Sequence, residues 1–290
     1  MLVSSVLILL ATSVGTAVWA VLLRLPQADL KATQAVGEEL GQDPRIRRFL
    51  RSRMAPGVAT GLALSAALFA TIVAGTVIGV VVYMVRRNSG VVGWDLRVAT
   101  WAGVHASDSS TRVLNLITNF GAAPIIVLVS VGVAIYGHLR WRSPSVWLFL
   151  ILVVGGQFLI ANGIKAAVER VRPAIHPLAG FSGASFPSGH STAAAATFAA
   201  VALVVGRGRS PRVRAALGGT AAGIAVAVGC SRMFLGVHWF SDVASGLALG
   251  WAWFAVCCVA FGGRILRFGV PVEVAKAQPP PAATAPSSAP

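Results

Sequence analysis

Charged residues are scarce in this sequence, and acidic residues are the scarcest of them. Only 11% of the 290 residues are charged, whereas 56% are hydrophobic, and the mean hydropathy is +0.77. A soluble globular domain carries about 25% charged residues, so this chain has too few to cover a surface that faces water. The same number suffices where lipid is the solvent for much of the surface. The composition therefore excludes an ordinary soluble domain and predicts an integral membrane protein.

Cysteine is also rare, and the three cysteines all lie within or at the end of apolar stretches: Cys230, Cys257 and Cys258. A disulfide framework needs an even, dispersed set of cysteines, and a metal site needs a spacing such as C-x-x-C. Neither pattern is present. We interpret these residues as small apolar packing groups.

Nine acidic residues stand against 24 lysines and arginines, which gives a formal net charge of +15. In a soluble protein such an excess would suggest nucleic acid as a partner. The sequence has no basic stripe interleaved with exposed aromatic residues, so we do not expect nucleic-acid binding. Excess arginine in short loops is instead the signal that orients a protein in a membrane.

Hydrophobic stretches run along nearly the whole chain, which indicates one membrane domain. A helix needs ~20 residues to cross a core of about 30 Å, and seven uncharged stretches span or nearly span it. They do not alternate as transmembrane strands would, so the predicted fold is an all-α, polytopic helical bundle. The predicted spans are residues 2–23, 57–85, 113–139, 144–164, 187–206, 215–230 and 243–263.

Two of these spans have particular features. The stretch 2–23 resembles a cleaved signal peptide in position, but it lacks a basic start and is long for one, so a retained helix is favoured. The stretch 215–230 is rich in Gly and Ala. Small residues let helices approach closely, so we expect this helix inside the bundle.

The segments outside the spans predict the orientation. Residues 25–56 form a basic connector, and the Pro- and Ala-rich tail 264–290 is predicted to be disordered. If the seven spans alternate, 16 of the 24 lysines and arginines fall on one side and 8 on the other. The richer side is expected to be cytoplasmic, which places the N-terminus outside and the C-terminus inside.

Two loops on the side with fewer basic residues hold most of the polar groups of interest. The first contains a lysine, six residues and Arg-Pro, and it ends in Pro-Ser-Gly-His. The second contains Ser-Arg, five residues, a histidine, three residues and an aspartate. The three segments are Lys165–Pro173, Pro187–His190 and Ser231–Asp242.

These residue types suit phosphoryl transfer, which needs positive groups around the phosphoryl oxygens, an in-line nucleophile and an acid for the leaving group. Lys165, Arg172 and Arg232 supply three cations, and guanidinium groups match phosphate oxygens. Ser188 can donate a hydrogen bond. Gly189 lets the backbone approach an anion closely, and both lie at the predicted start of a helix, where the free N–H groups favour an anion.

The two histidines suit the covalent steps. His238 and Asp242 are four residues apart, so on a helix they share one face. The carboxylate can then accept from one ring nitrogen and leave the other free to attack phosphorus. His190, when protonated, can give a proton to the leaving group. No metal or other cofactor is predicted, because the cations take its place and Mg²⁺ sites usually use carboxylates.

The three segments resemble, in order and at every motif position, the signatures K-x6-R-P, P-S-G-H and S-R-x5-H-x3-D of the type 2 phosphatidic acid phosphatase superfamily. The resemblance implies a six-helix core, here about 57–263, with the span 2–23 as an addition. It also implies that His238 forms a phosphohistidine, that Asp242 supports it and that His190 acts as the acid. The residues implied to hold phosphate are Lys165, Arg172, Ser188, Gly189 and Arg232.

We therefore expect a membrane phosphatase that acts on a lipid phosphate or diphosphate at the outer face of a plasma membrane. The Ala/Val/Arg-rich composition suggests a bacterium. Expected substrates are polyprenyl diphosphates such as undecaprenyl diphosphate, phosphatidylglycerophosphate or phosphatidate, with a lean toward the first because an outward site suits recycling of a carrier lipid. Two alternatives stay open: a phosphotransferase that uses an alcohol acceptor, and a non-catalytic lipid-phosphate binder or transporter. The sequence does not indicate an oligomeric state.

Overall fold

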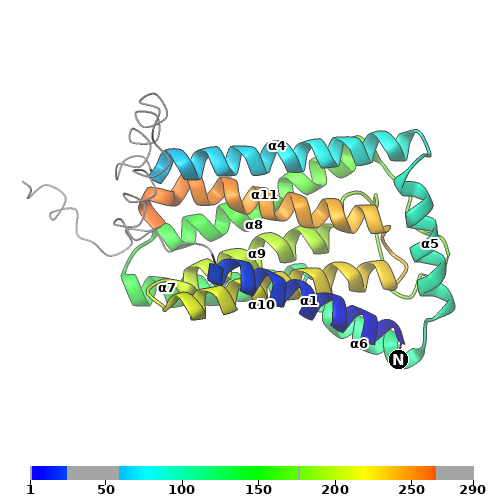
Figure 1. Cartoon of the computed structure of the whole chain (residues 1–290), viewed down its shortest axis with the longest axis horizontal. Coiled ribbons are helices and arrows are strands. Elements are labelled where there is room, and N and C mark those ends of the chain that lie inside the picture. The colour runs from blue at the N-terminus through cyan, green and yellow to red at the C-terminus, as the bar shows by residue number, and fades with distance from the viewer. Residues whose placement is uncertain (1, 25–58, 176, 266–290) are drawn as a thin grey trace, which may run out of the picture.

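The computed structural model describes residues 2–24, 59–175 and 177–265, and every regular element among them is a helix. The long helices lie side by side and form an elongated bundle (Figure 1). They are α1 (Leu2–Arg24), α4 (Ala59–Arg86), α7 (Ala123–Trp141), α8 (Ser145–Val168), α9 (Gly189–Gly206), α10 (Pro211–Phe234) and α11 (Phe240–Ile265). The predicted all-α bundle is confirmed. The predicted connector 25–56 and all but the first two residues of the predicted tail lie outside the described residues.

Six described helices are long and apolar enough to cross a membrane, namely α1 and α7 to α11. Helix α4 is followed by α5 (Val91–Val104) at a bend of 80°, and the pair adds a seventh span if it is counted as one. At one end of the bundle α8 and α10 stop and α9 and α11 begin. We call it the motif end. The opposite end, where α7 and α9 stop and α10 begins, is the distal end.

The predicted span 113–139 begins too early, because the structure has a span at Ala123–Trp141 and a separate short helix before it. Helix α6 (Asp108–Asn119) stops before the middle of that stretch, and α7 starts only at Ala123. Pro124 lies in the first turn of α7. A proline there starts a helix well, but in a helix interior it removes a hydrogen bond and clashes with the preceding turn. The apolar run therefore breaks at 120–122.

Two short helices also occupy the stretch that the sequence left as an outer loop. Helix α5 runs across the motif end, where α6 and the start of α1 also lie (Figure 1). Ser107 starts α6 with a capping box, in which its side chain accepts from the backbone of Ser110 and the side chain of Ser110 bonds back. Such a box satisfies two backbone donors that would otherwise have no partner. This end of the bundle is thus covered by folded helices.

Helix α9 forms the centre of the bundle. In its most apolar window 61% of the residues are buried, against 6% for α1. Helix α11 crosses it in close contact, because a Cβ at Gly246 would lie 2.7 Å from the Ser188 carbonyl oxygen, and one at Gly250 would lie 2.5 Å from that of Thr192. Small residues at these crossings bring the first turns of α9 and α11 together.

Helix α10 lies between α9 and α1, with half of its most apolar window buried, so the predicted position of this Gly- and Ala-rich segment inside the bundle is confirmed. Its contact with α1 also depends on glycine. A Cβ at Gly15 would lie 3.0 Å from the carbonyl oxygen of Gly219. Away from this contact, α1 exposes large apolar side chains such as Leu9 and Leu10, as expected of a helix that meets lipid.

Candidate active site

The two motif loops meet at the motif end, a convergence that the sequence could not establish. The backbone N–H of Leu178, in the first loop, donates to the carbonyl oxygen of Leu235 in the second at 2.9 Å. The N–H of Ser188 donates to the carbonyl oxygen of Asp242 at 3.1 Å. Backbone bonds therefore hold the two loops against each other on the first turns of α9 and α11.

A cavity of about 1190 Å³ opens beside these loops and contains most of the predicted site. Its other walls come from α7 and α8. Six of the eight predicted residues line it: Lys165, Arg172, Gly189, His190, Arg232 and His238. The other two, Ser188 and Asp242, are fully buried behind its wall.

Arg172 is held by backbone carbonyl groups on several sides. Its Nε donates to Gly183 at 3.0 Å, and its Nη1 donates to Val237 at 2.8 Å. Two further carbonyl groups, of Ser182 and Ala184, accept from Nη2. Burial lowers the pKa of Arg172 below the usual value of a guanidinium. The group is thus fixed in one orientation beside the cavity.

The other two cations approach from α8 and α10. The Nζ of Lys165 donates to the carbonyl oxygen of Ala184 at 2.7 Å. Arg232 is 6% exposed, and its Nη1 lies 3.5 Å from the Thr118 hydroxyl. Its Nε is buried without a hydrogen-bond partner among the described residues. A buried donor of this kind is costly unless an acceptor arrives, which favours an anion in the cavity.

His238 presents one ring nitrogen to Asp242 and the other to Arg172. Its Nδ1 lies 3.4 Å from Asp242 Oδ2, and its Nε2 lies 3.1 Å from Arg172 Nη1. These partners assign the proton to Nδ1 and the lone pair to Nε2. Burial lowers the pKa of His238 to about 4, so the imidazole is neutral at neutral pH. A neutral ring with its lone pair at the cavity is the form that can act as a nucleophile.

Asp242 has a stronger partner than the histidine that the sequence suggested. Arg170 Nη1 lies 2.5 Å from Asp242 Oδ1, and its Nη2 lies 2.6 Å from Oδ2 of Asp95 on α5. Asp95 also accepts from the backbone N–H of Ser241 at 2.9 Å and from its hydroxyl at 2.7 Å. The hydroxyl of Ser185 donates to Asp242 Oδ2. Asp242 is therefore fixed from several directions.

Arg170 and Asp95 are the site residues that sequence reasoning missed. Arg170 lies inside the first motif, two residues before Arg172, and its position fits a side chain at the membrane interface as well as one that supports Arg172. Asp95 is 1% exposed on a mostly apolar helix that also carries the exposed Arg97. An acidic residue in such a segment calls for a partner, and this was the available signal.

The first turn of α9 forms the remaining wall. Ser188 is the N-cap, and its hydroxyl oxygen accepts from the Ser191 N–H at 3.4 Å and from the Ser191 hydroxyl at 2.9 Å. In both bonds the Ser188 oxygen is the acceptor, so its hydroxyl proton is left for another acceptor. A direct hydrogen bond from Ser188 to phosphate stays a prediction. A Cβ at Gly189 would contact only Lys165 Cε, at 3.9 Å. The helix start is therefore open to an anion.

Comparison with known proteins gives a consistent result. The family model described as "PAP2 superfamily" matches residues 146–265, which include all eight predicted site residues. Phosphatidylglycerophosphatase B of Bacillus subtilis is 36% identical over 166 residues, which cover 54% of this chain and 77% of that protein. Lipid A 1-phosphatase of Rhizobium johnstonii is 41% identical over 120 residues, covering 38% of this chain and 44% of that protein.

A solved structure is also similar. It is the crystal structure described as the first transmembrane PAP2 type phosphatidylglycerolphosphate phosphatase from Bacillus subtilis, with a TM-score of 0.64 and 28% sequence identity. The similarity covers 69% of this chain and 99% of that one.

Proposed function

The chain belongs to the PAP2 superfamily and is a membrane lipid phosphatase, and from that premise we propose that it works through a phosphohistidine on His238. The observation that carries the proposal is the position of His238 Nε2, which faces a cavity lined by Lys165, Arg172 and Arg232. A neutral nucleophile among three cations matches what a phosphoryl group requires. The geometry alone would also suit a binder, but a binder needs no oriented imidazole.

The proposed reaction has two steps. In the first, His238 Nε2 attacks phosphorus, the bond from phosphorus to the leaving oxygen breaks, and His190 gives that oxygen a proton. In the second, water attacks the phosphohistidine, His190 takes a proton from it, and the phosphorus–nitrogen bond breaks to release inorganic phosphate. Asp242 stabilises the charge that develops on the ring, as the carboxylate of a catalytic triad does. The cations hold the phosphoryl oxygens in both steps.

The shape of the cavity supports a substrate with a long apolar part. Below Lys165 it is lined by Ala161, Phe158 and Val154, which fall on one face of α8. Residues 165 and 154 are 11 positions apart, which corresponds to about 16 Å along a helix. Ile126 of α7 lines the opposite wall. We propose that the phosphate of a lipid binds at the motif end while its chain lies between α7 and α8.

The identity of the lipid is part of the proposal. The similar proteins are named for phosphatidylglycerophosphate and lipid A, which puts phosphate monoesters of lipids first among the candidates. Polyprenyl diphosphate remains a candidate, because the distribution of 16 against 8 basic residues favours a motif end outside the cell, where carrier lipids are recycled. Neither candidate needs a resident metal in the proposed mechanism, since three cations line the cavity that would hold the phosphate.

The test is phosphate release by the purified protein in detergent with EDTA, across phosphatidylglycerophosphate, phosphatidate, lipid A and polyprenyl diphosphate. We expect release from at least one lipid, with or without EDTA, and none from a His238→Ala variant. Release that needs an added alcohol would identify a phosphotransferase instead. Lipid binding that survives in the variant, without release by the parent protein, would identify a binder.

A further inference from the structure

A second large cavity lies at the distal end, far from the phosphatase site. Its volume is about 1130 Å³, and it is bounded by the ends of α1, α7 and α9 and by parts of α10 and α11. Helix α9 takes part in both cavities: residues from Gly189 to Ala193 line the phosphatase site, and residues from Ala199 to Gly206 line the distal one. No described residue lines both cavities. The distal cavity is therefore a separate site.

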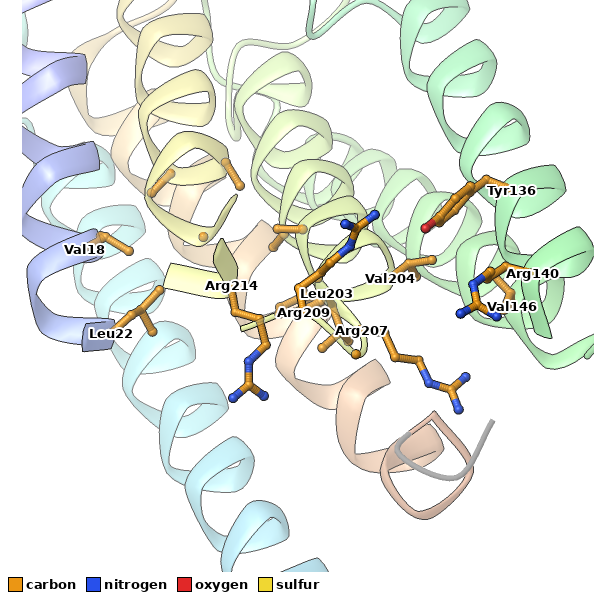
Figure 2. Close-up of a pocket in the computed structure, with 18 of the residues that line it drawn as sticks. Val18, Leu22, Tyr136, Arg140, Val146, Leu203, Val204, Arg207, Arg209 and Arg214 are labelled. Atoms are coloured by element: carbon orange, nitrogen blue, oxygen red, sulfur yellow. The ribbon is translucent and has the colours of Figure 1, made fainter. Parts of the chain in front are cut away.

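Four arginines line this cavity and are labelled in Figure 2: Arg140, Arg207, Arg209 and Arg214. They come from the end of α7, the turn after α9 and the first turn of α10. No acidic residue is among the described residues that line the cavity. Arg140 and Arg209 make no ion pair with any described residue. Four like charges around one space favour an anion between them.

The rest of the wall is apolar. In Figure 2, Val18 and Leu22 of α1 lie on one side and Tyr136 of α7 on the other. Between them, Leu203 and the buried Val204 come from α9. The guanidinium carbon of Arg207 also lies 4.7 Å from the centre of the Trp141 ring. Tryptophan is common at the boundary between membrane and water, so this rim is typical of that boundary.

A cationic rim over an apolar interior matches an amphiphile with an anionic head. Ordinary small-molecule sites have a volume of about 300–1,000 Å³. This cavity is larger, so it has room for a headgroup and part of an acyl chain. It lies where the transmembrane helices end, which is the depth of lipid headgroups. Its lining contains no His, Cys, Ser, Asp or Glu among the described residues, so it has no counterpart of His238, His190 or Asp242.

We propose that this cavity, the distal arginine pocket, binds an anionic phospholipid that is distinct from the lipid hydrolysed at the motif end. The phosphate lies among the arginine side chains, because a guanidinium group can donate two parallel hydrogen bonds to phosphate oxygens. The upper part of one acyl chain lies against α1 and α9. The bound lipid joins the end of α1 to the core of the bundle. The proposal does not depend on the mechanism at His238.

The test compares two double variants of the full-length protein. Arg140→Gln with Arg209→Gln removes two charges from the pocket. Arg142→Gln with Arg212→Gln removes two exposed charges from the same end that do not line it. Native mass spectrometry of delipidated protein measures binding of phosphatidylglycerol, with phosphatidylcholine of the same chains as the neutral-head reference. Each arginine near an anionic headgroup is worth about fivefold in affinity.

We expect the pocket variant to bind phosphatidylglycerol about 25-fold more weakly and the control variant to change by less than about twofold. An equal loss in both variants would mean that only the overall surface charge matters and would overturn the proposal. Equal binding of phosphatidylcholine by the parent protein would overturn it as well.

A third variant separates a lipid from free phosphate. Ala202→Phe fills the apolar part of the pocket and keeps all four arginines. We expect it to lose phosphatidylglycerol but not the weak binding of inorganic phosphate. If phosphatidylglycerol still binds as in the parent, or inorganic phosphate alone displaces it at equal concentration, the pocket is not a lipid site. The melting temperature of each variant checks its folding.

Discussion

Arg170 and Asp242 form a buried ion pair of 2.5 Å, although they are 72 residues apart and belong to different motifs. Through its second nitrogen Arg170 also binds Asp95, so one guanidinium links α5, the first motif loop and α11. Asp242 in turn lies beside His238. This chain of contacts fixes the orientation of the imidazole from outside the cavity, and it makes Arg170 a positioning residue.

Replacing Arg170 is therefore expected to slow the reaction without removing any group that touches phosphate. A misplacement of about 1 Å at a reacting group costs about 100-fold in rate, so we expect Arg170→Ala to lower kcat by about that factor and to change KM little. Arg170→Lys should not rescue it, because one ammonium cannot serve two carboxylates as a planar fork does. Steady-state kinetics of phosphate release measure both effects.

A double-mutant cycle with Asp95→Asn is the control for this prediction. If Arg170 acts through the contact chain, the two substitutions should be far from additive in kcat. Additive losses, or a rise in KM at constant kcat, would mean that Arg170 contacts the substrate directly.

The covalent intermediate gives the second prediction. Brief reaction with a lipid carrying radioactive phosphate should label the protein, and the label should be absent in His238→Ala. Asp242→Asn is expected to lower kcat by about 10⁴-fold, the cost of losing the carboxylate that sets the tautomer in a catalytic triad. Label retained in His238→Ala would place the nucleophile elsewhere.

The pH dependence is the third prediction. Burial lowers the pKa of His238 to about 4, so the nucleophile should lose its lone pair only as the pH falls through that value. The acid limb of kcat/KM should then lie near pH 4 and not near 6.5, the ordinary value for histidine. Substrates whose phosphate groups have different pKa values provide the control, since a limb that moves with the substrate does not report on His238.

The same shift predicts how stability changes with pH. Between about 4 and 6.5 the unfolded chain binds a proton at His238 that the folded chain does not, so stability should decrease as the pH falls through this window. A His238→Gln variant should lack that part of the pH dependence. Melting temperatures of the two proteins across the window measure the difference.

The contact between α1 and α10 gives the fifth prediction. A Cβ at Gly219 would lie 2.5 Å from the Gly15 carbonyl oxygen and 2.9 Å from Trp19 Cβ, so Gly219→Leu should push α1 away. Overpacking of this kind costs about 1–3 kcal/mol. Gly79→Leu is the matched control, because nothing lies within 4 Å of its Cβ position. Thermal unfolding in detergent should separate the two variants, and equal melting temperatures would contradict the tight contact.

The sequence by itself determined the membrane character, the helical class and the three motifs that supply most of the candidate site. Insertion into a bilayer depends on the apolar character of contiguous residues, so the stretches 2–23 and 144–164 could be predicted almost to their ends. The exception was 113–139, where hydropathy continues across the turn before Pro124. The motifs were readable for the same reason, since each is contiguous.

The tertiary structure alone decided which side chains meet. His238 and Asp242 are four residues apart, so their contact is local, although His238 precedes the start of α11 at Phe240, whereas Arg170 lies 75 residues from Asp95. The distal arginine pocket likewise draws on several helix ends. Such encounters depend on how closely helices cross, and here the absence of a Cβ at a few glycines sets that distance. No local pattern encodes it, because the partner backbone that fills the space lies elsewhere in the chain.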